Sequence, residues 1–452
     1  GSFAAMLRLL SGLLLLALAS FDARGQTSLV VVVLDDVSWD DVDQLATPSL
    51  DTLAARGRTY TSAYASALCS PSRYQLMFGR LPHRDFVGHS LVSTGKDPED
   101  LGPPPERLSV ATALRTHGYR TGLFGKWHVN NVALGQRGEL ARIHGFGTWR
   151  AGIAGNLTGK NDHYAWPRLD DGYSRKSTAY TTDAIESAFE AWWTATDGPK
   201  LAYVSFAAAH APHQAAPASM LPEGHRIKPT LRARFESAVL ALDHAIGRMA
   251  AYVDPATTLF VVVADNGTPQ DVPPPAGTSP GYKLTQYQGG IRVPLWIAGP
   301  GVTHGVEDSL VQLVDLPTTL LDVAGCRPNH GFEDGRSLVP TLDGSAPSGR
   351  PWAFLQRFLP NGGPAASLVH DECAVVWPDG WKVLSPSPTT GQVFDLAADP
   401  GETRDLAAER DALRAELAWL LSRQPRVELD RSTSGRWARE RAAKAGAEAP
   451  QP

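Results

Sequence analysis

The chain has 452 residues, which is enough for one large α/β domain and a smaller second one. Hydrophobic residues make up 43% of the chain, charged residues make up 20%, and the formal net charge at pH 7 is −5. This composition is that of a globular protein with a sizeable core, and it excludes the basic excess that nucleic-acid binding requires. We therefore expect no nucleic-acid partner.

Residues 1–25 have the pattern of a secretory signal peptide. Arg8 supplies a positive charge, residues 9–18 are apolar, and residues 17–19 (Ala-Leu-Ala) offer a cleavage site. The apolar stretch is too short to cross a bilayer comfortably, so we expect no stable membrane span, with an N-terminal anchor as the alternative. The pattern predicts an exported protein that is periplasmic, secreted or in the secretory-pathway lumen.

Four short apolar runs are each followed by polar residues. Runs of this length, rich in β-branched residues, are typical of buried parallel strands. Ligands of open α/β sheets sit beyond the carboxyl ends of the strands, so we expect the polar residues to meet at one sheet edge. The runs are residues 28–34 before Asp35 and Asp36, 119–124 before Lys126 and His128, 201–206 before His210, and 258–264 before Asp265 and Asn266.

Segments with apolar residues at helical spacing alternate with these runs. The alternation predicts a doubly wound, mostly parallel α/β sheet with helices on both faces. The expected helices cover residues 49–56, 109–116, 182–193 and 231–252.

The composition changes to Gly, Ser and Pro near residues 344–351, which indicates a linker. We expect the main domain to cover residues 26–344 and a smaller C-terminal subdomain to cover residues 351–425. The tail of residues 431–452 has few apolar anchors, and its composition predicts poor order. The subdomain is expected to hold antiparallel strands at residues 374–377, 381–384 and 392–396, followed by an amphipathic helix at residues 404–423.

Asp35, Asp36, Asp265 and Asn266 offer three carboxylates and one amide oxygen at two strand ends. Either pair alone is more often a turn or a helix cap. Two such pairs after two buried strands need a counter-charge, and their hard oxygen ligands favour Ca²⁺ or Mg²⁺.

The chain has three cysteines, Cys69, Cys326 and Cys373. An odd number in an exported protein suggests one special thiol. If that thiol is Cys69, then Cys326 and Cys373 either form a disulfide or remain two buried thiols, and the sequence leaves both possibilities open.

Several motifs now carry a resemblance to one family. Residues 69–73 (Cys-Ser-Pro-Ser-Arg) and residues 118–128 (GYRTGLFGKWH) resemble the two signatures of the formylglycine-dependent sulfatases, in the alkaline-phosphatase-like superfamily. The early Asp-Asp, the His-x-Pro at His210, the Asp-Asn-Gly at Asp265 and the Gly-Tyr-Lys ending at Lys283 follow in the family's order. The resemblance extends over nearly the whole chain after the signal peptide.

The resemblance implies a large mostly parallel sheet with a small C-terminal subdomain, and a role for each matching residue. Cys69 would be oxidised to formylglycine by a formylglycine-generating enzyme, giving a hydrate with one hydroxyl that attacks sulfur and another that expels sulfate. Arg73 and Lys126 would hold this group, and His128 would help the sulfated intermediate collapse. His210 would be the leaving-group acid and Lys283 would bind the sulfate, with Lys126 and His210 also contacting substrate. One cation, Ca²⁺ or Mg²⁺, would be held by Asp35, Asp36, Cys69, Asp265 and Asn266.

The expected function is hydrolysis of a sulfate ester, either a sulfated glycan or an aryl sulfate. One alternative is a phosphodiesterase or phosphonate monoester hydrolase of the same superfamily, and another is a non-catalytic sulfate-ester-binding protein with an unmodified Cys69. A G-x-S-x-G match at residues 277–281 does not indicate a serine esterase, because prolines stand where the required strand would be.

The aromatic-rich stretch of residues 148–177 has two interpretations. Its aromatic side chains could stack on a sugar or aryl ring at the rim of the site, or they could simply pack in the core. The residues concerned are Trp149, His163, Tyr164, Trp166 and Tyr173.

Overall fold

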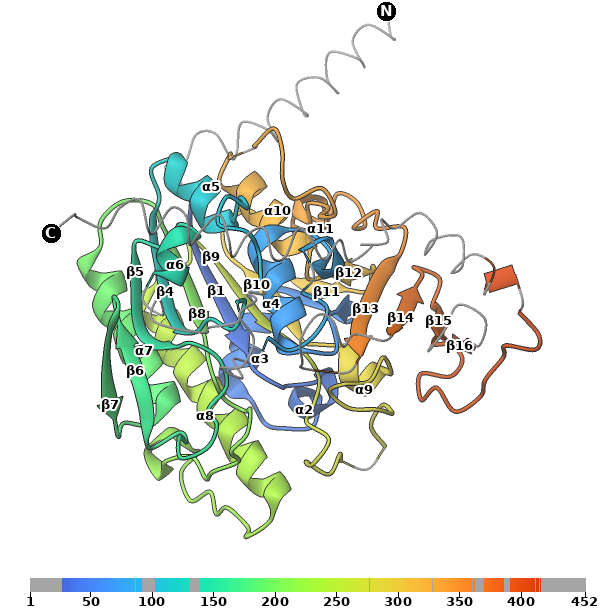
Figure 1. Cartoon of the computed structure of the whole chain (residues 1–452), viewed down its shortest axis with the longest axis horizontal. Coiled ribbons are helices and arrows are strands. Elements are labelled where there is room, and N and C mark those ends of the chain that lie inside the picture. The colour runs from blue at the N-terminus through green and yellow to red at the C-terminus, as the bar shows by residue number, and fades with distance from the viewer. Residues whose placement is uncertain are drawn as a thin grey trace, which may run out of the picture.

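The computed structural model describes residues 27–415 apart from residues 86, 92–101, 131–138, 276, 327, 360, 362–369, 386–390, 411 and 414. The expected signal peptide and C-terminal tail lie outside these residues. Figure 1 shows a broad central sheet between helices, with a small second sheet beside it. Within the described residues, every helix is too short or too polar to cross a bilayer.

The central sheet has ten strands, and β1 (Ser28–Leu34) lies near its middle. It pairs in parallel with β8 (Lys200–Ser205) on one side and with β9 (Thr258–Ala264) on the other. All residues of β1 and β9 are buried, since helices cover both faces of the sheet, and this burial explains their unbroken apolar runs. Both strands have the predicted bounds.

The remaining strands extend the sheet on both sides, and β4 (Arg120–Lys126) follows β8. This strand continues two residues beyond the predicted end. The pairing with its neighbour shifts between Phe124 and Lys126, where Gly125 has a φ of 90° that the chain needs for this bulge. Lys126 is therefore the last residue of a strand. The other strands are β5 (Thr148–Ile153), β6 (Trp166–Asp170), β7 (Tyr173–Ser177), β10 (Leu295–Ala298), β2 (Gly57–Tyr60) and β11 (Gly305–Glu307).

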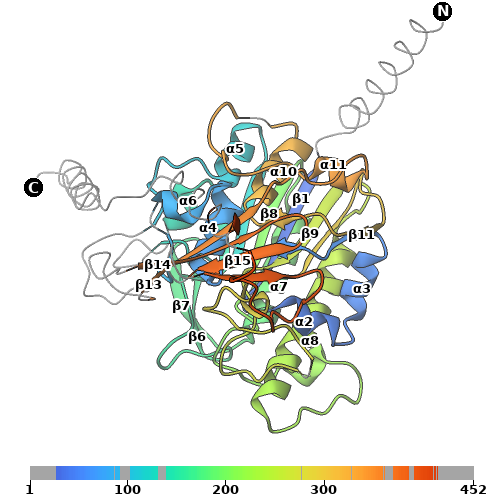
Figure 2. The ribbon, with the colours of Figure 1, turned by 90° about the vertical axis from the view of Figure 1, so that its right-hand side faces the viewer.

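Helices cover the two faces of the central sheet, as Figure 2 shows. On one face α3 (Pro48–Ala54) and α7 (Thr181–Ala195) both pack against α8 (Leu231–Tyr252), which has the predicted bounds. On the other face α4 (Cys69–Phe78) packs with α5 (Val110–Thr116) and α10 (Asp315–Val323). Short elements complete this part: α2 (Trp39–Asp43), η1 (Pro82–Asp85), α6 (Leu140–Ile143), η2 (Ala218–Met220), α9 (Gln288–Ile291), α11 (Val339–Leu342), and the pair β3 (Ala63–Tyr64) and β12 (Val311–Gln312).

The small sheet is antiparallel and has four strands in chain order. Its inner face packs on the main body, where Leu355 and Ala374 share a hydrophobic cluster with Tyr64 and Ile291. Three of its strands match the predicted ones within a few residues, and the first was not predicted. The strands are β13 (Ala353–Leu359), β14 (His370–Val376), β15 (Trp381–Ser385) and β16 (Gln392–Asp395).

The helix predicted for residues 404–423 is wrong in its first two turns. Residues 404–410 form a loop and a turn, because side-chain oxygens take the backbone donors that a helix would use. The carboxylate of Asp399 accepts from the backbone N–H of Arg404, and that of Asp405 accepts from Ala407. Most of the remaining segment, residues 416–423, lies outside the described residues.

Cys326 and Cys373 do not form a disulfide, which decides between the two possibilities left open by the sequence. Cys326 is buried in the main core, whereas Cys373 is buried in a separate cluster on the small sheet.

Candidate active site

Two neighbouring strands bring the acidic pairs together at the carboxyl edge of the sheet. Leu34, the last residue of β1, pairs in register with Ala264, the last residue of β9. Asp35 and Asp36 follow the first strand, and Asp265 follows the second. The backbone N–H of Asp36 donates to Oδ1 of Asp265 over 3.1 Å, and Asp36 has a φ of 62°. All three carboxylates are buried, so their charges require compensation.

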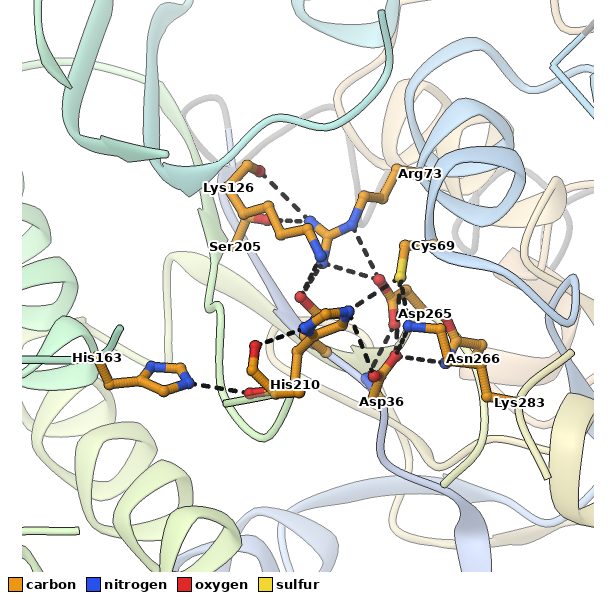
Figure 3. A network of polar contacts seen from close by, with 12 residues as sticks. Asp36, Cys69, Arg73, Lys126, His163, Ser205, His210, Asp265, Asn266 and Lys283 are labelled. Carbon is orange, nitrogen blue, oxygen red and sulfur yellow. Dashed lines mark hydrogen bonds and ion pairs between the residues drawn. The ribbon is translucent and has the colours of Figure 1, made fainter. Parts of the chain in front are cut away.

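Cys69 is the first residue of α4, and its side chain points into this acidic cluster (Figure 3). Its Sγ lies 3.4 Å from Oδ1 of Asp35 and 3.7 Å from Oδ1 of Asp36. Burial, and then the charge of Asp265, raise the pKa of the Cys69 thiol well above its ordinary value. An unmodified thiol here is protonated and is a poor nucleophile.

Arg73 lies one helical turn after Cys69 on the same face of α4. Its Nε donates to Oδ2 of Asp265 over 2.9 Å, and its Nη2 lies 2.8 Å from the same oxygen. Its Nη1 donates to Oγ of Ser205 and to the backbone oxygen of Lys126. One buried guanidinium therefore joins α4 to the ends of three strands.

Lys126 is the last residue of β4, and His128 follows two residues later. Nζ of Lys126 pairs with Oδ2 of Asp35, and Lys126 is 1% exposed. His128 is also buried, has a φ of 52°, and donates its backbone N–H to Ala154. Burial, with the charge of Lys126, lowers the pKa of His128 well below its ordinary value, which keeps this ring neutral.

His210 and Lys283 approach from the loops after β8 and β9. Nε2 of His210 lies 3.7 Å from Oδ2 of Asp36, and its Nδ1 is hydrogen-bonded to the backbone oxygen of Ala211. Burial, and then Lys283, lower the pKa of His210 to about 4. Nζ of Lys283 lies 2.6 Å from Oδ1 of Asp36 and 3.2 Å from Sγ of Cys69. The structure thus brings the site residues predicted from the sequence into one network of contacts, and it buries His128 two residues after Lys126 without a side-chain hydrogen bond to that network among the described residues.

The donor atoms of this cluster fit a hard cation. One ligand atom from each of Asp35, Asp36, Cys69 and Asp265 lies within 4.8 Å of the others. Asn266 uses its Nδ2 to donate to Asp36 and Gly267, which leaves its Oδ1 buried and without a hydrogen-bond partner among the described residues. A buried acceptor left unpaired is costly, and a cation at this point would satisfy it.

The pKa values of the acidic groups reflect how strongly their charges interact. Burial alone would raise the pKa of Asp35, but Lys126 and Arg73 outweigh it and hold that pKa well below its ordinary value. Burial and the neighbouring Asp35 raise the pKa of Asp265 to about 7. Carboxyl groups that are buried side by side cannot all be ionised without a further positive charge.

Sequence reasoning missed two residues of the site. Ser205, at the end of β8, accepts from Arg73, and no local motif marks it. His163 appeared only as one aromatic among several, yet its Nε2 is bonded to the backbone oxygen of His210 (Figure 3).

The aromatic stretch mainly packs in the core. Trp149 and Trp166 are buried, and their indole N–H groups donate to the backbone oxygens of Gly125 and Ala179. His163 is buried as well. The interpretation as a stacking rim is therefore wrong for these three residues, while Tyr173 is 82% exposed.

Comparisons with known proteins agree with this geometry. The sequence model of the Sulfatase family matches residues 27–326. N-acetylgalactosamine-6-sulfatase of Mus musculus is 28% identical over 369 residues, which cover 72% of this chain and 68% of that protein. Arylsulfatase A of Homo sapiens is 29% identical over 395 residues, with coverages of 77% and 74%.

Solved structures show the same fold. A structure described as Ps i-CgsB in complex with k-i-k-neocarrahexaose aligns with a TM-score of 0.76 at 22% identity, and covers 91% of this chain and 97% of that one. Another, BT4656 in complex with its substrate D-glucosamine-2-N,6-O-disulfate, aligns with a TM-score of 0.69 at 17% identity, with coverages of 89% and 100%. The family match extends over more than half of the chain and includes every residue of the cluster, so this chain belongs to the sulfatase family and is a sulfatase of the alkaline-phosphatase-like fold.

Proposed function

We propose that the protein hydrolyses a sulfate ester with formylglycine, formed from Cys69, as its nucleophile and with one divalent cation, Ca²⁺ or Mg²⁺. One observation carries this proposal. Sγ of Cys69 lies 3.2 Å from Nζ of Lys283 and 3.4 Å and 3.7 Å from carboxylate oxygens of Asp35 and Asp36. Asn266, whose Oδ1 has no partner within the part of the chain that the structure describes, donates to the same Asp36. The reacting position thus has next to it both a cationic group for the sulfate and carboxylate ligands for a cation.

The cation would be held by Asp35, Asp36, Asp265, Asn266 and the modified Cys69, and it would supply electrophilic stabilisation of charge on the sulfate oxygens. Formylglycine supplies a hydrated aldehyde whose two hydroxyls attack sulfur and expel sulfate in turn. Three carboxylates face three cationic side chains, Arg73, Lys126 and Lys283, so a bound cation would give the site the positive charge that an anionic ester needs.

The chain's own residues have separate tasks in this proposal. Arg73 and Lys126 orient the group at position 69, and Lys126 and Lys283 bind the sulfate oxygens. His210, when its ring is protonated at both nitrogens, presents Nε2–H to the leaving oxygen as the proton donor. His128, which is neutral and buried, accepts a proton when the sulfated intermediate collapses.

We further propose a sulfated glycan as substrate, and export through the signal-like residues 1–25 after maturation by a formylglycine-generating enzyme. The relatives support the glycan, since one is an N-acetylgalactosamine-6-sulfatase and one structural neighbour, BT4656, is in complex with its substrate D-glucosamine-2-N,6-O-disulfate. The proposed catalytic domain, residues 26–344, contains all the site residues, and the proposed subdomain, residues 351–425, contains the small sheet.

Comparison of substrates tests the reaction. We expect kcat/KM to be highest on sulfate esters when the enzyme is offered an aryl sulfate, matched aryl phosphodiester and phosphonate substrates, and a panel of sulfated mono- and oligosaccharides. A higher value on the phosphodiester or the phosphonate would instead establish the alternative of a phosphodiesterase or phosphonate hydrolase. Cys69→Ala serves as the control and should lack activity on all of them.

The mass of the proteolytic peptide that contains Cys69 tests the modification. Conversion of the thiol to the aldehyde lowers this mass relative to the encoded sequence. An unmodified thiol in protein from a host with a functional formylglycine-generating enzyme, together with sulfate-ester binding and no turnover, would establish the non-catalytic alternative.

A further inference from the structure

His163 connects two parts of the chain through its ring. It lies between β5 and β6 and is 3% exposed. Its Nδ1 is 2.7 Å from Oγ1 of Thr181, the first residue of α7, and its Nε2 is 2.9 Å from the backbone oxygen of His210 (Figure 3). The ring therefore bridges a helix start and the loop that carries the proposed leaving-group acid.

These partners determine the tautomer of His163. A backbone oxygen can only accept a hydrogen bond, so the proton is on Nε2 of His163. Nδ1 then has a free lone pair, and the hydroxyl of Thr181 donates to it. Burial lowers the pKa of His163, although its bond to His210 opposes this effect, and a lowered pKa agrees with a neutral ring.

The backbone of His163 is held as firmly as its ring. Its N–H donates to Oε1 of Gln214 over 2.8 Å, and its carbonyl oxygen accepts from the backbone N–H of Thr181 over 3.0 Å. Four hydrogen bonds of one buried residue thus link the loop at residues 210–214 to α7. A side chain fixed in this way can fix its partner in turn.

The bond from His163 controls where the ring of His210 points. Nδ1 of His210 donates a hydrogen bond to the backbone oxygen of Ala211 over 2.8 Å, so Nδ1 carries a proton. Nε2 is the nitrogen that faces the cluster. The orientation of that ring follows from the two successive carbonyl groups of residues 210 and 211. His163 fixes the first of these carbonyls.

We propose that His163 is a positioning residue that aims Nε2 of His210 at the leaving oxygen of the substrate. This inference rests on the proposed function. When the bond between sulfur and the leaving oxygen breaks, that oxygen keeps the electron pair and takes the Nε2 proton of an imidazolium at His210, which leaves a neutral ring with its proton on Nδ1 towards Ala211. The negative charge of the bound sulfate favours this imidazolium before the transfer. The need for this proton grows as the leaving alcohol becomes less acidic. Displacement of His210 should therefore lower the rate of hydrolysis far more for esters with poor leaving groups than for esters with good ones.

Two variants of His163 separate positioning from packing. His163→Leu fills the space but cannot donate, whereas His163→Gln places an amide N–H near the position of Nε2. We expect His163→Leu to lower kcat by about 10² on phenyl sulfate and by only a few fold on 4-nitrophenyl sulfate. His163→Gln should recover most of the activity on phenyl sulfate.

Thr181 provides an independent pair if His163→Leu does not fold. Thr181→Val removes, at nearly constant volume, the hydroxyl that donates to Nδ1 of His163, and Thr181→Ser retains it. We expect Thr181→Val to show the same selective loss on phenyl sulfate, in smaller measure, while Thr181→Ser retains the wild-type ratio of the two rates.

The pattern of rates decides the outcome. An equal loss on both substrates, or no loss, in His163→Leu or in Thr181→Val would overturn the positioning role while wild-type hydrolysis upholds the proposed function. If the wild-type protein, with position 69 shown by mass to be modified, hydrolyses no sulfate ester, then the proposed function fails and the inference fails with it.

Discussion

At the scale of single residues, Arg73 shows how one side chain can hold a site together. Its guanidinium contacts Asp265, Ser205 and the backbone of Lys126, and it is fully buried. These partners lie in different directions, and the planar fork of arginine reaches all of them, which a lysine ammonium cannot do. Removing the side chain would leave the buried carboxylate of Asp265 without its cationic partner.

Substitution of Arg73 should therefore affect both activity and stability. We expect Arg73→Lys to lower kcat/KM at least about 100-fold and to lower the free energy of unfolding by about 2 kcal/mol, because the charge remains but most hydrogen bonds are lost. Urea unfolding and steady-state kinetics measure the two effects. Arg80→Lys is the matched control, since Arg80 pairs with a half-exposed Glu333 and should lose less than about 0.5 kcal/mol. Equal effects of the two substitutions would contradict this account.

His89 makes stability depend on pH. Burial lowers the pKa of His89 to about 4. The unfolded chain binds a proton there below about pH 6.5, whereas the folded protein does so only below about pH 4. The contribution of the neutral ring is thus complete above about pH 6.5 and is lost as the pH falls towards 4, by up to about 3 kcal/mol.

Comparison with His89→Gln isolates this effect from the other titrating groups. We expect the free energy of unfolding of the wild-type protein to fall relative to that of the variant between pH 7.5 and pH 4.5, as measured by urea unfolding. Parallel pH profiles of the two proteins would show that His89 titrates normally in the fold.

At the scale of elements, a buried ion pair attaches the small sheet to the segment that carries Lys283. Nζ of Lys382 in β15 pairs with Oε1 of Glu402, and both side chains are fully buried. Oε2 of Glu402 accepts from the backbone N–H of Gln288, the first residue of α9, over 2.7 Å. The side chain of Gln288 in turn donates to the hydroxyl of Tyr64 over 3.1 Å.

Replacing only one partner of this ion pair should lower the free energy of unfolding more than replacing both partners. We expect Lys382→Met to lower the free energy of unfolding by about 3–5 kcal/mol, because it leaves the buried charge of Glu402 uncompensated. The double variant Lys382→Met/Glu402→Gln retains an oxygen for the N–H of Gln288 and should recover much of that loss. A double-mutant cycle of urea unfolding measures the coupling, and additive losses would argue against a specific pair.

At the scale of the whole molecule, the cluster is assembled from segments between Asp35 and Lys283, so a ligand that binds it should stabilise the entire fold. We expect Ca²⁺ or Mg²⁺ to raise the melting temperature of chelator-treated protein, with a gain of about 2.7 kcal/mol at 100 times the dissociation constant. Asn266→Ala removes a neutral ligand without changing any charge and should weaken this gain. A melting temperature that responds to neither cation nor chelator would contradict the proposed cation.

Much of the fold was predictable because its signals are local. The apolar runs at residues 28–34 and 258–264 are strands that are buried on both faces, and residues 231–252 have helical spacing along their whole length. The predictions failed where nearby side chains compete for the backbone or where a strand depends on a pairing partner. The loop at residues 404–410 is held by Asp399 and Asp405, and the strand β13 exists because β14 pairs with it.

The sequence by itself determined the alternation of strands and helices, the acidic pairs at two strand ends and the family motifs around Cys69. Each of these features depends on a few consecutive residues. The tertiary structure alone decided which of these groups touch. It separated Cys326 from Cys373, buried Trp149 and Trp166 in the core, and left Oδ1 of Asn266 without a partner among the described residues. It also placed His163 against His210, 47 residues away. A contact over that separation depends on how whole strands and loops pack, and no local pattern of side chains encodes it.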